Sequence, residues 1–188
     1  DAVSLTGPQA GIFADADHTR ARITKITPLK IQQELSRGRV VIVAGFQGVS
    51  RTKEITTLGR GGSDTTAVAL AAALRAERCE IFTDVPGIFS ADPRLVPTAK
   101  RYETLPLDLV LEMAVKGAQV MHPRSIEIAR ERQLSIFVGL AQSEHQGAAG
   151  MAGGSCPGAS KLGRSGHVDR THLKKEGTML VPQRVELP

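Results

Sequence analysis

Residues 58–74 read LGRGGSDTTAVALAAAL, a loop with three glycines that runs directly into an alanine-rich segment. The segment from Thr65 to Leu74 has high helix propensity, and its alanines allow close packing. Successive glycines let backbone N–H groups approach a ligand, and the start of a helix favours an anion. Arg60 can bind a carboxylate or phosphate through its forked guanidinium. The same pattern fits a plain turn in which Ser63 or Asp64 caps the helix, so both interpretations remain open.

Short apolar runs flank this loop and helix on both sides. Val40–Ala44 is β-branched and bounded by turn residues, which is typical of a strand buried on both faces in a parallel sheet. Cys79–Asp84 is a second short strand, and 135–139 and 178–181 are further ones. Helices are predicted over 27–36, 107–117 and 125–132. In the first, Thr27 is the expected cap and Pro28 stands in the first turn. In the second, the residues expected to face inward are Leu109, Val110, Met113 and Ala114. This alternation predicts βαβ units and an α/β fold.

A second group of polar residues follows the strand at 79–84. Thr83 and Asp84 stand at its carboxyl end, and Phe89 and Arg94 come shortly after the turn at 85–87. In open α/β sheets ligands bind at this edge, where a ring can pack on a base and an arginine can reach phosphates. The alternative is structural: the polar pair satisfies turn backbone groups and Phe89 belongs to the core.

Histidines and cysteines do not suggest a metal site. His122 precedes a proline at a helix start, where a capping or packing histidine is more common than a base or ligand. His167 and His172 have the spacing of a zinc-finger pair, but Cys156 is the only thiol near them and no CxxC completes a site. We therefore expect no metal held by the protein itself.

The composition excludes several classes of protein. Hydrophobic residues make up 41% and charged residues 23%, as in ordinary globular proteins. The net charge is +5, but the basic residues are scattered and Tyr102 is the only tyrosine, so no nucleic-acid platform is expected. No apolar run approaches the roughly 18 residues of a membrane helix. Two distant cysteines favour a reduced, cytoplasmic compartment over a disulfide framework.

The composition and the apolar patterning of the sequence change after Leu140. Residues 147–177 contain eight glycines and almost no apolar periodicity, so this stretch cannot bury enough surface to offset its ordering entropy. We expect three segments: a domain at 1–140, a flexible glycine-rich insertion or linker at 141–176, and a possible final strand and tail at 177–188.

Several motifs together resemble the aspartate kinases, which share the amino-acid kinase fold. The match covers about residues 1–140 and consists, in order, of SLTGPQAG at 4–11, AGFQGV at 44–49, TTLGRGGSDTTA at 56–67, TDVPGIFSADPR at 83–94, EMA at 112–114 and HPR at 122–124. The resemblance implies a three-layer αβα sandwich with a mostly parallel sheet, incomplete at the N-terminus. It also implies transfer of the γ-phosphoryl group of ATP, carried with Mg²⁺, to the side-chain carboxylate of L-aspartate.

The resemblance assigns roles to individual residues. Asp64 would orient the catalytic cationic groups. The amino-acid substrate would be contacted by Phe46, Arg60, Gly61, Gly62 and Ser63. The nucleotide would be held by Ser63, Thr83, Asp84, Phe89, Arg94, Gln119 and Val120.

Departures from the family pattern limit the activity expected. The family's opening Lys-Phe/Tyr-Gly-Gly-Thr-Ser strand and loop, whose lysine stabilises the transferring phosphoryl group, is not found in this sequence. Many relatives carry a second lysine where Gln119 stands, and Lys116 is not assigned that role. We therefore expect a fragment that is inactive alone and that needs its N-terminal half, or assembles as a homo-oligomer. The alternative is a non-catalytic nucleotide-binding or partner-binding module. No regulatory ACT domain is found in this sequence, so the sequence makes no prediction about feedback by lysine or threonine.

Overall fold

The computed structural model describes residues 1–141 and 177–182 of the 188-residue chain. The elements, in chain order, are β1 (Ala2–Leu5), β2 (Ile12–Ala14), β3 (Ile23–Ile26), α1 (Leu29–Ser36), β4 (Val40–Val43), β5 (Gln47–Val49), β6 (Ile55–Thr57), α2 (Gly62–Ala73), β7 (Arg78–Thr83), β8 (Thr104–Pro106), α3 (Leu107–Val115), α4 (Pro123–Glu131), β9 (Ser135–Leu140) and β10 (Gly177–Val181). The predicted α/β class is confirmed.

The strands form three sheets in the part of the chain that the structure describes. Strands β1 and β4 make a parallel pair, a second sheet has the order β3-β2-β5-β6, and a third has the order β7-β9-β10-β8. Parallel ladders join β1 to β4, β2 to β5, β7 to β9 and β10 to β8, whereas β10 runs antiparallel to β9. The sheets are therefore rich in parallel pairs, as predicted, but they do not form one continuous sheet.

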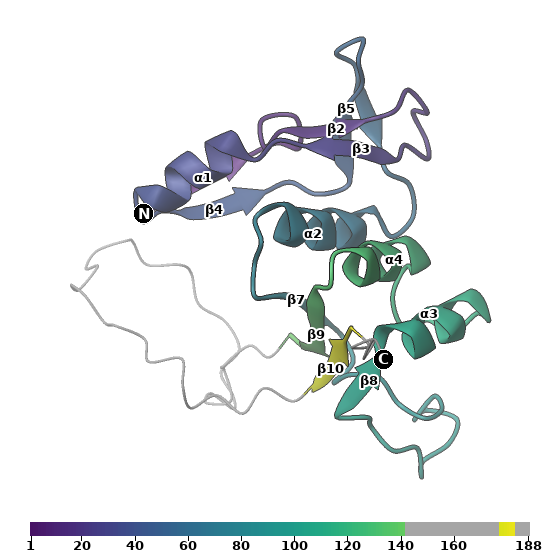
Figure 1. Cartoon of the computed structure of the whole chain (residues 1–188). Coiled ribbons are helices and arrows are strands. Elements are labelled where there is room, and N and C mark those ends of the chain that lie inside the picture. Colours follow the sequence, from purple (N-terminus) through teal and green to yellow (C-terminus); the bar gives the residue numbers. More distant parts are fainter. Residues whose placement is uncertain (142–176, 183–188) are drawn as a thin grey trace, which may run out of the picture.

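Helices α2 and α4 form a layer between the N-terminal strands and the sheet β7-β9-β10-β8 (Figure 1). The larger hydrophobic core lies between these helices, α3 and that sheet, and its fully buried members include Val68, Ile126, Ile136 and Leu180. A smaller core joins α1 and the first strands to Leu70 of α2. Helix α2 therefore contributes to both cores, through Val68 and Leu70.

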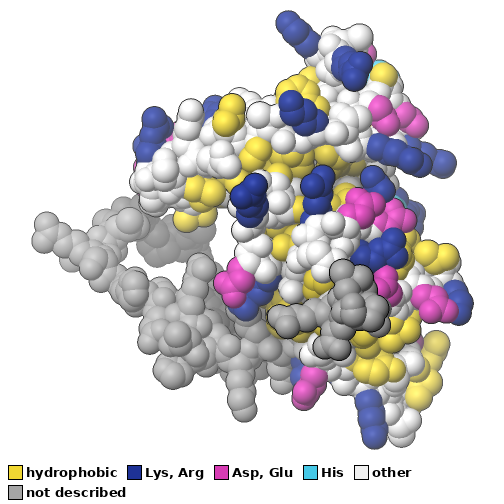
Figure 2. Space-filling model, viewed as in Figure 1, with side chains coloured by type: hydrophobic (Ala, Val, Ile, Leu, Met, Phe, Trp, Pro, Cys, Tyr) yellow, Lys and Arg dark blue, Asp and Glu magenta, His cyan; other side chains and the backbone are white. Residues whose placement is uncertain are grey.

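Strand β4 corrects one prediction. Val41 and Val43 pack on the smaller core, but Val40 and Ile42 on the opposite face are 63% and 56% exposed. Successive side chains of a strand point to opposite faces, and α1 covers only one of them (Figure 1). The apolar run was thus correctly predicted as a strand but wrongly predicted to be buried on both faces. Figure 2 shows hydrophobic side chains at the surface where β4 lies.

Two helices also differ in detail from the sequence-based expectation. Helix α1 begins at Leu29 with Pro28, and not Thr27, at the cap position, and no side chain caps it. The Thr27 N–H donates to the Gly11 carbonyl (2.9 Å). In α3, Val110 is buried as predicted, but Leu109 is exposed. The predicted inward face of α3 is therefore narrower by one residue.

A strand does form near the C-terminus. Strand β10 pairs with both β9 and β8 and buries Leu180 completely. The glycine-rich segment beyond Ala141, which includes Cys156, His167 and His172, lies outside the described residues, as does the tail beyond Pro182.

Candidate functional site

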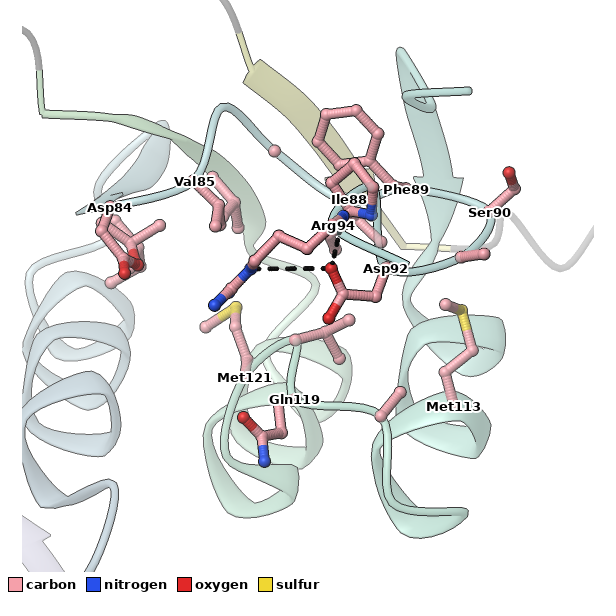
Figure 3. A pocket seen from close by; sticks show the side chains of 18 of the residues that line it. Asp84, Val85, Ile88, Phe89, Ser90, Asp92, Arg94, Met113, Gln119 and Met121 are labelled. Carbon is pink, nitrogen blue, oxygen red and sulfur yellow. Dashed lines mark hydrogen bonds and ion pairs between the residues drawn. The ribbon is translucent and has the colours of Figure 1, made fainter. Parts of the chain in front are cut away.

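A cavity of about 690 Å³ opens at the carboxyl end of β7 (Figure 3). Its walls come from the end of β7, the loop that follows it, the first turn of α2 and the segment between α3 and α4. Six of the seven residues predicted to hold nucleotide line it: Thr83, Asp84, Phe89, Arg94, Gln119 and Val120. The predicted orienting residue, Asp64, lines it as well. These seven residues, from three separate stretches of sequence, thus meet around one space.

The loop after β7 carries three of the four charged side chains that line this cavity. The Asp92 carboxylate accepts a hydrogen bond from the Arg94 backbone N–H (2.9 Å) and lies 3.6 Å from its guanidinium Nε. Figure 3 shows both side chains directed toward the cavity. The Thr83 hydroxyl donates to the neighbouring Asp84 carboxylate (2.9 Å). Both pairs are exposed to solvent, so they orient side chains more than they stabilise the fold.

The glycine-rich loop needs its glycines for two different reasons. Gly61 caps α2 with φ of 71°, a left-handed conformation that glycine adopts at little cost. A Cβ atom there would also lie 2.4 Å from Cβ of His122. At Gly62 a Cβ atom would lie 2.8 Å from the Phe46 ring. The loop is therefore packed tightly between Phe46 on one side and His122 on the other.

His122 caps helix α4, as the sequence predicted. Its ring Nδ1 accepts a hydrogen bond from the Arg124 backbone N–H (3.2 Å). Its backbone N–H also lies near the Asp64 carboxyl, where it acts to lower the pKa of that group. One residue therefore connects the start of α4 to the first turn of α2.

Asp64 is half-buried in the first turn of α2. Burial is the main influence on its carboxyl and raises its pKa above the usual 3.8, while the His122 N–H and the His122 charge act in the opposite direction. The Asp64 charge also helps to raise the pKa of the buried Cys79 thiol to about 11, after the larger effect of burial. Asp64 thus lines the cavity and also influences a thiol of the larger core.

The predicted substrate residues gather at the start of α2, outside the lining of the cavity. Arg60 and Ser63 are exposed there, next to Gly61 and Gly62. Phe46 adopts φ of 72° and is fixed by hydrogen bonds from its N–H to the Thr66 hydroxyl (3.1 Å) and from the Leu58 N–H to its carbonyl (2.9 Å). Ser63, predicted to touch both ligands, lies one residue before Asp64. The first N–H groups of α2 have no partners within the helix, so this end can bind an anion.

Sequence reasoning missed the apolar walls of the cavity. Ile81, Met113, Met121 and Val138 line it, and they come from β7, α3, the turn before α4 and β9. In the sequence these residues read as ordinary core positions, and only the three-dimensional arrangement shows that their side chains face a ligand-sized space.

The cavity has few positive charges. Of the described residues that line it, Arg94 alone is cationic. Lys116, which lies near Gln119 in sequence, forms an ion pair with Glu112 one turn earlier on the exposed side of α3. Within 1–141 and 177–182, no three His, Cys, Asp or Glu side chains gather as a metal site would require. No helix in these ranges has the length and apolar character to cross a bilayer.

The fold and this cavity define a class of protein. The sequence profile of the Amino acid kinase family matches residues 1–139, so the chain belongs to that family. Within it, the chain is similar to the aspartokinases: it is 56% identical over 138 residues to aspartokinase 2 of Bacillus subtilis and 53% identical over 146 residues to the aspartokinase of Geobacillus stearothermophilus. These matches cover 73% and 78% of this chain but 34% and 36% of the relatives. The chain thus spans about a third of the length of these relatives.

Solved structures show the same relationship. Aspartokinase III of E. coli, in complex with aspartate and ADP, matches with a TM-score of 0.74 and 30% identity, covering 100% of this chain and 36% of that one. The same enzyme in complex with lysine and aspartate matches with a TM-score of 0.71. The UMP kinase of Bacillus anthracis, at 18% identity and a TM-score of 0.52, shares the fold over 77% of this chain and 51% of its own.

Proposed function

We propose that this chain supplies the nucleotide-binding part and one edge of the substrate-binding part of an aspartate kinase. The reaction is transfer of the γ-phosphoryl group of MgATP to the side-chain carboxylate of L-aspartate, which gives 4-phospho-L-aspartate. This is the first step of lysine, threonine and methionine biosynthesis, and we place it in the cytoplasm. The observation that carries the proposal is the meeting of Asp64 and the six nucleotide residues around one cavity.

The cavity suits a nucleotide in size and chemistry. Its volume of about 690 Å³ falls within the roughly 300–1,000 Å³ of small-molecule sites. Phe89 and the methionines offer an apolar surface for a base, and Arg94 offers a forked donor for phosphates. Mg²⁺ would enter with the nucleotide and neutralise phosphate charge, with the oxygens of Asp84 and Asp92 available to it.

The start of α2 suits the carboxylate groups of the amino acid. Arg60 stands in the loop, and the start of α2, which favours an anion, follows it directly. Asp64, which faces the cavity from this turn, is placed between the two ligand regions. Phosphoryl transfer depends mainly on alignment and on charge neutralisation, so this adjacency is what the reaction requires.

The described cavity is nevertheless short of positive charge for catalysis. One arginine among its lining residues cannot neutralise a transferring phosphoryl group in the way that a phosphate-binding lysine does. We therefore propose that the chain binds MgATP but transfers phosphate only with an N-terminal half or within a homo-oligomer. The exposed side chains of β4 offer a place for such a partner.

Isothermal titration with MgATP tests the nucleotide site directly. We expect binding to the 188-residue chain, and about tenfold weaker binding after Arg94→Ala, because one charge-assisted contact is lost. Arg132→Ala, which removes an exposed arginine at the end of α4, is the matched control and should leave the affinity unchanged. No heat of binding from a chain that is folded by circular dichroism would refute the proposal.

Complementation separates the kinase from a non-catalytic module of the same fold. A separately produced N-terminal half of an aspartokinase is mixed with this chain, and aspartyl phosphate is trapped as its hydroxamate. We expect product only from the mixture. Nucleotide binding without any product would favour the non-catalytic module.

A further inference from the structure

Strand β10 supports the cavity loop from the other end of the chain. Its yellow ribbon passes beside Ile88 and Phe89 in Figure 3. Ninety positions separate Ile88 from Thr178, yet a hydrogen bond joins them inside the protein. No family motif or local pattern in the sequence links these two regions.

The hydroxyl of Thr178 makes two hydrogen bonds in a site with 0% exposure. It accepts from the Ile88 backbone N–H (2.9 Å) and donates to the Tyr102 carbonyl (2.6 Å). The Tyr102 N–H in turn donates to the Ile88 carbonyl (2.9 Å). The two ends of the loop are thus joined to each other both directly and through one threonine hydroxyl.

Further contacts connect the same segments. The Arg101 guanidinium donates to the carbonyls of Pro86 (3.4 Å) and Gly177 (3.2 Å). Gly87 adopts φ of 122°, and a Cβ atom there would lie 2.6 Å from the Thr178 hydroxyl oxygen. The loop therefore approaches β10 as closely as its backbone allows, and glycine is required at the point of contact.

We propose that Thr178 is a positioning residue for the nucleotide, an inference that rests on the proposed function. Ile88 is buried and Phe89, the next residue, lines the cavity. Because the Thr178 hydroxyl fixes the Ile88 backbone, it also fixes where the Phe89 ring stands against the bound base. Thr178 touches no ligand itself and acts through the loop.

Two substitutions in the 188-residue chain separate the hydroxyl from the volume of its side chain. Thr178→Val keeps the shape but cannot hydrogen-bond, and it leaves the Ile88 N–H and the Tyr102 carbonyl without this partner. Thr178→Ser keeps the hydroxyl. Thr104→Val, at an exposed position of β8, makes the same chemical change without removing a partner of the Thr178 hydroxyl and is the matched control.

Two measurements are made on each variant. Hydrogen exchange without ligand reports on the Ile88 amide, and titration with MgATP reports on the site. In Thr178→Val we expect the Ile88 amide to exchange at least about tenfold faster and MgATP to bind about tenfold more weakly, while Thr178→Ser and Thr104→Val match the unsubstituted chain. If Thr178→Val does not fold, Gly87→Ala disturbs the same contact from the loop side and should give the same two results.

The outcomes are distinguishable. An unchanged Ile88 amide in Thr178→Val overturns the inference, and so does a released amide with unchanged MgATP affinity. A protected Ile88 amide in an unsubstituted chain that binds no MgATP marks the failure of the proposed function, and the positioning role for nucleotide fails with it.

Discussion

The two regions of this molecule differ in the size of the hydrophobic core that each contributes to. The C-terminal body, residues 62–141 and 177–182, has a core cluster of thirteen buried residues, whereas the N-terminal strands, residues 1–57, share a cluster of five with α2. The body contains the cavity and its walls. The N-terminal strands leave one face of β4 in solvent. The proposed nucleotide site thus lies in the region with the larger core, and the exposed apolar face of β4 lies in the region with the smaller one.

The largest expected effect is the difference in unfolding free energy between two isoleucine-to-alanine substitutions, one in each region. Ile136→Ala in β9 removes a fully buried side chain and should lower the free energy of unfolding by about 2–5 kcal/mol. Ile42→Ala in β4 removes a side chain that is more than half exposed and should cost about 0.5 kcal/mol. Urea unfolding followed by circular dichroism measures both. Equal costs would show that β4 is covered in solution and that the contrast between the regions is wrong.

A pair of glycines gives the next largest effect. Gly61 and Gly38 have nearly the same backbone, with φ of 71° and 72°, but a Cβ atom would collide with His122 at Gly61 and meet nothing within 4 Å at Gly38. Gly38→Ala should cost about 1–2 kcal/mol from backbone strain alone. Gly61→Ala should cost about 2–4 kcal/mol because the collision adds to the strain. Their difference in urea unfolding isolates the contact between α2 and α4, and identical values would argue against it.

The open face of β4 predicts self-association. Val40→Thr combined with Ile42→Thr keeps strand propensity and changes stability little, but it makes this face polar. We expect the unsubstituted chain to dimerise or aggregate, and the double variant to associate about tenfold more weakly. Light scattering across a concentration series measures this. A monodisperse monomer from the unsubstituted chain would contradict the prediction.

The smallest effect is a pH dependence at the junction of the two regions. Because burial raises the pKa of Asp64, the folded chain binds a proton there more tightly than the unfolded chain, whose value is near 3.8. Asp64 therefore stabilises the folded chain below pH 3.8, and this stabilisation is lost as the pH rises through the higher pKa that the group has in the folded chain. Asp64→Asn removes this dependence. As the pH rises from 3.8 through the folded pKa of Asp64, the melting temperature of the variant should therefore rise relative to that of the unsubstituted chain. A constant difference between the two proteins would contradict it.

Much of the body could be predicted from sequence, because its signals are local. The alanine-rich helix α2, the β-branched strands and the capping His122 each depend on residues a few positions apart. Burial of β4 could not be predicted, since an apolar run does not reveal whether one face or two are covered. The short strands β1, β2, β3, β5, β6 and β8 were missed because three- and four-residue segments carry almost no periodicity.

The candidate site also contains residues that could be predicted from local sequence and one, Thr178, that could not. Asp64, Thr83, Asp84, Phe89 and Arg94 stand in continuous motifs, so they could be named before their arrangement was known, although their roles remain predictions. The contact of Thr178 with the cavity loop could not be predicted from sequence, because its hydrogen-bond partners lie 76 and 90 positions away. Long-range hydrogen bonds of a buried hydroxyl leave no periodic or compositional signal.

The position of β10 has a consequence for synthesis of the chain on the ribosome. This strand stands between β9 and β8 in the sheet, yet it is the last described element to be translated. The 36 residues between Leu140 and Gly177 take roughly 2–7 s to add at the usual rate of 5–20 residues per second. Throughout that delay, β9 has one edge unpaired, and β8 lacks its partner β10. The nascent protein thus passes through a period in which chaperones or other nascent chains can reach the sheet, and that period ends when β10 emerges.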